Sequence, residues 1–180
     1  MSHQANYICY KSNILTRLIK IFHDKDSMPD LRAAIICSFT TYLTIHDHPS
    51  NKLTAELEEL EIKLAEEVIS NVYDASVSVR KEMVIFLSTF IYKYLPLFRL
   101  AAFSSLQEEI VIIEAHEELF EFRRKAQIYG TIYSACWKAL LIFSSDPHDE
   151  VQNLSEQVIV YVLNSLKESP ELKEPFEYCH

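Results

Sequence analysis

Apolar positions recur every three or four residues along most of the chain, which is the pattern of amphipathic helices. One apolar stripe runs from Ile14 to Phe22, and a second follows from Leu31 to Leu43. Two further pairs of stripes occupy residues 53–72 with 79–94, and residues 132–143 with 151–162. The strict alternation that is typical of strands is not sustained anywhere. The pattern therefore predicts an all-α protein built from paired helices.

A short acidic turn separates the two stripes of each pair. The three turns align without gaps when they start at Asp26, Asp74 and Asp146, where they read DSMPDLR, DASVSVR and DPHDEVQ. Aspartate is a favourable residue at a helix N-terminus, because its side chain accepts backbone N–H groups and its charge suits the helix dipole. A turn that recurs between helix pairs is typical of HEAT or armadillo repeats, whose period is roughly 40–47 residues.

The repeat predicts a HEAT/armadillo-type α-solenoid of about three antiparallel helix pairs with one extra acidic helix. We expect the helical-repeat domain to span residues 11–168. Its parts are repeat 1 at about 11–46, repeat 2 at about 52–95, an insertion at 96–127 and repeat 3 at about 128–168, followed by a tail at 169–180. Within the insertion, residues 96–105 read as irregular or as a short helix, and residues 106–127 as the acidic helix.

Arginine follows two of the turns and predicts a ladder between neighbouring repeats. Arg32 and Arg80 lie six residues after Asp26 and Asp74, whereas the third turn has Gln152 at this position. An aspartate of one turn can pair with an arginine of a neighbouring turn. Because exposed ion pairs stabilise by only about 0–1 kcal/mol, we expect the ladder to set alignment while buried apolar area supplies most of the stability.

The composition excludes several classes of function. The 180 residues carry a net charge of −9, which disfavours nucleic-acid binding, and the single glycine, Gly130, cannot form a Gly-rich phosphate loop. The four cysteines form no CxxC pair and read as reduced thiols, with Cys37 and Cys136 expected in cores. The most apolar run, residues 83–98, contains Lys93 and Pro96, so we expect a buried helix and no direct membrane insertion.

No residue pattern predicts catalysis, a metal site or a cofactor. His116 is followed by two glutamates, but the second histidine of a zinc motif is missing at Phe120. His46 and His48 lack a third ligand nearby. The glutamate runs at residues 56–67 and 108–121 are best explained as solvated helix faces. The chain is therefore expected not to be an enzyme.

A dense aromatic cluster has two explanations that the sequence leaves open. Tyr92, Tyr94, Phe98 and Phe103 lie near a helix end, where they would be either core residues or a partner-binding patch. Trp137, on a helical stripe, is expected in the core.

Two segments resemble a known family. Residues 79–88, VRKEMVIFLS, with Tyr92-Lys93-Tyr94 after them, resemble a VRKEL helix of Raptor, the scaffold family of TOR complex 1. Ile132-Tyr133, then WKALL at 137–141 and SDPHDEV at 145–151, resemble Raptor's tryptophan helix and the turn that follows it. The likeness extends over residues 11–166, and its segments occur in the family's order.

This resemblance implies a non-enzymatic scaffold without cofactors, drawn from Raptor's central repeats. The implied partners are TOR kinase, other subunits of TOR complex 1 and Rag-type GTPases. The implied location is the cytoplasm, with recruitment to lysosomes or vacuoles through partners. Caspase-like and propeller sequences are missing, and a short acidic helix replaces a long serine-rich loop, so either a piece or a reduced relative fits. The alternative function is a generic HEAT-repeat adaptor in intracellular trafficking or transport.

Overall fold

The regular structure in the described part of the chain is entirely helical. The computed structural model describes the backbone of residues 3–24, 26–45, 55–115 and 131–167. It describes the burial of the side chains of residues 13–24, 26–44, 58–105 and 131–167. The helices in these ranges are α1 (His3–Phe22), α2 (Pro29–Ile45), α3 (Ala55–Ile69), α4 (Val77–Lys93), α5 (Leu95–Ala115), α7 (Ile132–Phe143) and α8 (Asp149–Lys167). The predicted all-α class, with three helix pairs and one additional helix, is confirmed.

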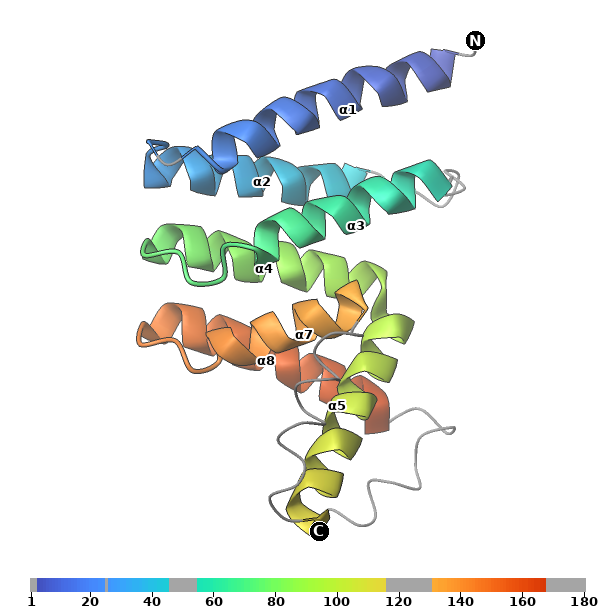
Figure 1. Cartoon of the computed structure of the whole chain (residues 1–180), viewed down its shortest axis with the longest axis vertical. Helices are drawn as coiled ribbons and strands as arrows, with labels where there is room; N and C mark the ends of the chain where they lie inside the picture. Colours follow the sequence, from blue (N-terminus) through green and yellow to red (C-terminus); the bar gives the residue numbers. More distant parts are fainter. Residues whose placement is uncertain (1–2, 25, 46–54, 116–130, 168–180) are drawn as a thin grey trace. The chain divides into compact units, whose positions relative to one another are not determined.

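The helices divide between two compact units, Met1–Phe90 and Ile91–His180. In the first unit, α1 is antiparallel to α2 and α3 is antiparallel to α4 (Figure 1). Helix α1 packs on α2, and α2 packs on α3. The α1–α2 and α3–α4 turns lie on the same side of this unit, so corresponding positions of the two turns are neighbours (Figure 1).

Burial in the first unit follows the apolar stripes that the sequence contains. Phe22 of α1, Phe39 and Leu43 of α2, and Phe86 of α4 are at most 2% exposed. A fully buried side chain of this kind stabilises the fold by roughly 1.5–3 kcal/mol relative to an exposed one. Helix α2 begins at Pro29, where a missing N–H costs little because the first turn has no intrahelical acceptor for it.

In the second unit, α5 packs on both α7 and α8, and α7 packs on α8. Helix α7 has a defined start, because the Thr131 side chain accepts a hydrogen bond from the backbone N–H of Ser134. Trp137 is 4% exposed and so lies in the core. The apolar residues of α5, α7 and α8 that are described as at most 2% exposed are Phe98, Ala102, Cys136, Leu140, Phe143, Val151, Val162 and Leu166.

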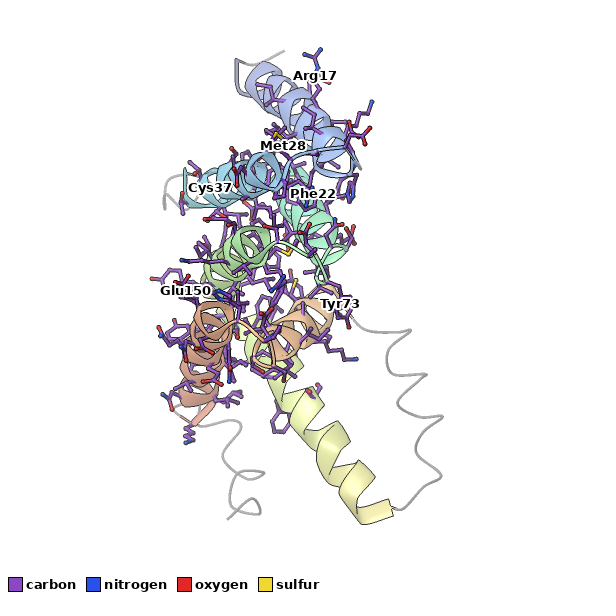
Figure 2. The ribbon with its side chains drawn as sticks, turned by 90° about the vertical axis from the view of Figure 1, so that its left-hand side faces the viewer. Arg17, Phe22, Met28, Cys37, Tyr73 and Glu150 are labelled. Atoms are coloured by element: carbon purple, nitrogen blue, oxygen red, sulfur yellow. The ribbon has the colours of Figure 1, made fainter. Side chains whose placement is uncertain are left out.

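The structure settles one open alternative of the sequence and contradicts one expectation. Residues 96–105, which read as irregular or as a short helix, are helical and belong to α5, which runs continuously from Leu95 to Ala115. Pro96 is compatible with this helix because it lies in the first turn, where the N–H that proline lacks would have no intrahelical acceptor. Cys37 is exposed, unlike the buried Cys136, because it lies on the outer face of α2 beside Ser38 and Thr41 (Figure 2). The expected acidic helix beyond residue 115 lies outside the described residues.

Candidate functional site

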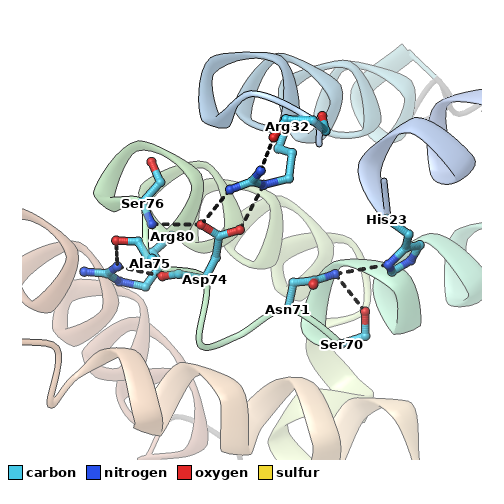
Figure 3. Close-up of polar contacts among 9 residues, drawn as sticks. His23, Arg32, Ser70, Asn71, Asp74, Ala75, Ser76 and Arg80 are labelled. Carbon is cyan, nitrogen blue, oxygen red and sulfur yellow. Dashed lines mark hydrogen bonds and ion pairs between the residues drawn. The ribbon is translucent and has the colours of Figure 1, made fainter. Parts of the chain in front are cut away.

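The α3–α4 turn is organised around one carboxylate. Asp74 accepts the backbone N–H of Ser76 at 2.8 Å through Oδ1, which closes the turn. The Arg32 side chain, from the start of α2, donates to both carboxylate oxygens, at 3.0 Å from Nε and 3.3 Å from Nη2 (Figure 3). The Arg32 and Asp74 side chains are 18% and 9% exposed. This ion pair therefore joins two successive repeats in a largely solvent-excluded place.

The two arginines of the predicted ladder make different hydrogen bonds. Arg32 also donates to the carbonyl oxygen of Ser27 in its own turn. Arg80 donates from Nη1 to the carbonyl oxygens of Asp74 and Ala75, at 2.7 and 3.0 Å (Figure 3). These carbonyls precede α4, so Arg80 fixes the entry of the chain into its helix.

In the first turn, the structure gives the aspartate role to Asp24, not Asp26. The backbone N–H of Asp26 donates to Oδ1 of Asp24 at 3.1 Å. The same contact, from a residue two positions later, recurs at Asp74 and at Asp146, whose Oδ1 accepts the N–H of His148 at 2.9 Å. Asp26 itself is exposed. The gapless alignment therefore uses Asp26, which lies two residues after Asp24, the aspartate that closes the first turn.

The same alignment is nevertheless in register at the helix starts. Arg32 and Arg80 are each the fourth residue of their helices, which begin at Pro29 and Val77. The first turn has two more residues between its aspartate and its helix than the second turn has. Leu31 begins the second apolar stripe of the sequence, yet it is 47% exposed, whereas Val79, at the same position of its own helix, is fully buried.

A second link between the repeats was not predicted. His23, just after α1, lies with its Nε2 2.6 Å from a carboxylate oxygen of Glu67 in α3. Its Nδ1 lies 3.5 Å from Nδ2 of Asn71 (Figure 3). The signal for this link is the offset of 48 residues that aligns the first two turns. His23 and Asn71 are also 48 residues apart, and stacked repeats bring corresponding positions together.

The predicted aromatic patch does not form one surface. Phe98 is fully buried and packs edge-on against Tyr133, with ring centroids 5.5 Å apart, so it is corrected to a core residue. Tyr94 and Phe103 are half-buried, and Tyr94 lies 5.7 Å from the same Tyr133 ring. Tyr92 is 66% exposed. Of the four, Tyr92 is thus the residue best placed to touch a partner.

Exposed aliphatic residues follow Tyr92 on α5. Leu97 and Leu100 are 38% and 54% exposed, and their spacing of three places them on one face of the helix. We use the name outer patch for three exposed apolar residues that are close in the sequence, Tyr92 near the end of α4 and Leu97 and Leu100 on α5, on two helices that meet at a bend of 106°. Exposed apolar residues that include an aromatic one are typical of protein–protein contacts.

The described residues contain no group of three or more metal-ligating side chains. His46, His48 and His116, which were considered as ligands, lie outside the described part of the chain. No single helix among the described residues is long and apolar enough to cross a membrane. Helix α4 and residues 95–105, which meet at a bend of 106°, reach that length and apolar character only when they are taken together.

Comparisons with known proteins give a consistent result, although no family model matches the sequence. Target of rapamycin complex 1 subunit mip1 of Schizosaccharomyces pombe is 32% identical over 173 residues, which cover 96% of this chain and 12% of mip1. The corresponding subunit KOG1 of Saccharomyces cerevisiae is 34% identical over 125 residues, covering 67% of this chain and 8% of KOG1. The crystal structure of Chaetomium thermophilum Raptor superposes with a TM-score of 0.72. By sequence and by fold, the chain is similar to a segment of Raptor.

The match to the Raptor structure has 32% identity and covers 93% of this chain but 13% of Raptor's. The Raptor-like chain therefore spans between 8% and 13% of the length of the relatives it matches. The resemblance inferred from residues 79–94 and 132–151 is confirmed, and the solenoid class agrees with it. The match is to a helical segment, which fits the predicted location among Raptor's helical repeats.

Proposed function

We propose that the Raptor-like chain is a non-enzymatic scaffold segment of TOR complex 1. The observation that carries this proposal is 32% identity to a TOR complex 1 subunit along 96% of the chain. The turn geometry supports it, because Arg32 and Asp74 are occupied in joining repeats. The trafficking adaptor considered above has no comparable support.

The proposed partners are TOR kinase and the other subunits of TOR complex 1, with Rag-type GTPases as further partners. The outer patch is the proposed contact with TOR kinase, since it combines an exposed tyrosine with two exposed leucines. The proposed location is the cytoplasm, from which bound partners would bring the complex to the lysosome or vacuole surface. In this role the repeats bind and position the partner, and the kinase carries out the catalysis.

The proposal is tested by exchanging a segment of mip1, which is a subunit of target of rapamycin complex 1. The matching segment of fission-yeast mip1 is replaced by this chain, and the amount of TOR kinase that copurifies is measured. We expect copurification within about tenfold of the unaltered subunit, a loss of at most about 1.4 kcal/mol in binding. The control is the same subunit carrying Tyr92→Ala and Leu100→Ala in the exchanged segment, which we expect to bind less. A well-expressed exchange protein that recovers no kinase would rule the proposal out.

A further inference from the structure

Helix α1 differs in charge from the rest of the chain. Its sequence contains three cationic residues, Lys11, Arg17 and Lys20, and neither aspartate nor glutamate. The whole chain has a net charge of −9, so the residues outside α1 carry −9 − 3 = −12. A basic helix on so acidic a protein favours an acidic counterpart.

Arg17 and Lys20 of α1 share an exposed face with aliphatic side chains. Ile14 and Ile21 are both 41% exposed, although each has the type of side chain that a packed helix normally covers. Arg17 lies between them, at spacings of three and four, so the three residues lie on one face. Arg17 points away from α2, toward the free side of the unit (Figure 2). We call Ile14, Arg17, Lys20 and Ile21 the basic face.

Helix α8 carries a face of the complementary type. Its exposed acidic residues are Asp149, Glu150 and Glu156. Val160 and Tyr161 are 53% and 44% exposed, and Val160 shares a face with Glu156 because they are four residues apart. We call Glu156, Gln157, Val160 and Tyr161 the acidic face. Both faces thus place a charged residue beside exposed apolar residues at helical spacing.

No other described helix places an exposed acidic residue three or four positions from an exposed large apolar residue. Helix α3 is more acidic, with glutamates at six of its fifteen positions, but it contributes no exposed large apolar side chain to the described surface. Helix α5 exposes leucines beside Arg99, a cation, within its described side chains. The acidic face of α8 is therefore the best match on the chain for the basic face of α1.

We propose that the basic face of α1 docks on the acidic face of α8 in a second copy of the chain. Such a contact joins different surfaces, so it is heterologous and can add copies one after another. It also continues the packing of helix on helix that repeat proteins use internally. Because a single helix pair buries little area, we expect a dissociation constant on the order of 100 µM. This association is independent of the proposed role in TOR complex 1.

Sedimentation velocity of the full chain tests the proposal by measuring mass against concentration. We expect Arg17→Glu and Glu156→Lys each to weaken self-association roughly tenfold, since each converts an attraction into a repulsion. Matched controls are Lys63→Glu and Glu66→Lys on exposed positions of α3, which make the same changes in net charge and should leave association unchanged.

Mixing the two variants gives the decisive result. The Arg17→Glu chain presents a face that attracts the altered α8 of the Glu156→Lys chain, so an equimolar mixture should regain association. A chain that stays monomeric at millimolar concentration would overturn the proposal, and so would a mixture that fails to associate. Sedimentation with vesicles of phosphatidylserine and phosphatidylcholine tests whether the basic face binds an anionic lipid surface instead. Vesicle binding lost in Arg17→Glu but not in Lys63→Glu would assign the basic face to lipid and overturn the proposal.

Discussion

Replacing Phe98 by alanine is expected to lower the free energy of unfolding by about 3–5 kcal/mol, as is typical for a buried phenylalanine. Phe98 is fully buried and contacts the Tyr133 ring of α7, so its removal leaves a cavity where α5 meets its neighbours. Urea unfolding followed by far-UV circular dichroism measures this loss. The reading of this residue as core predicts a lower midpoint with little change in slope.

Tyr92→Ala is the control for this prediction, because the two residues belong to the same predicted aromatic cluster. Tyr92 is 66% exposed, so its removal should change the free energy of unfolding by no more than about 0.5 kcal/mol. Equal losses for the two variants would mean that the separation of the cluster into core and surface residues is wrong.

Replacing Asp74 by alanine is expected to cost about 2–3 kcal/mol of unfolding free energy. The change removes the acceptor for Arg32 and for the N–H of Ser76, and leaves a guanidinium of 18% exposure without its carboxylate. The double variant Arg32→Ala/Asp74→Ala should cost less than the sum of the single changes, because both single changes remove the same pair. Chemical unfolding of the three variants measures the coupling.

Asp26→Ala is the matched control, since it lies at the corresponding place in the gapless alignment of turns. Asp26 is exposed, and Asp24 accepts the hydrogen bond that closes the first turn. Its removal should change stability by no more than about 0.5 kcal/mol. If Asp26→Ala proved as costly as Asp74→Ala, the assignment of the turn to Asp24 would be contradicted.

The helices were predictable because their apolar residues recur at the helical period. The positions of Arg32 and Arg80 were also predictable, because they are counted from the helix starts at Pro29 and Val77. The choice between Asp24 and Asp26 was not predictable, since both are aspartates near the end of α1. Only the number of residues needed to close the first turn separates them, and that number differs from the second turn.

The candidate surface was less predictable than the fold. Exposure of an aromatic side chain depends on which face its helix presents, and the sequence left open whether residues 96–105 are irregular or a short helix. No face could then be assigned to Phe98, which the helical start at Leu95 places in the core. The link from His23 to Glu67 crosses 44 residues, and its signal in the sequence is the offset between the first two turns, which does not name the two partners. Contacts between repeats depend on stacking, which periodicity alone does not specify.

Direct binding of this chain to purified TOR kinase tests the proposed scaffold role most directly. The chain is immobilised, the kinase is titrated, and fission-yeast mip1 serves as the positive reference. We predict saturable binding that Tyr92→Ala weakens roughly thirtyfold, the effect of a hot-spot residue, while Tyr73→Ala, at an 80% exposed tyrosine of the α3–α4 turn, leaves it unchanged. No detectable binding at kinase concentrations that saturate mip1 would contradict the account.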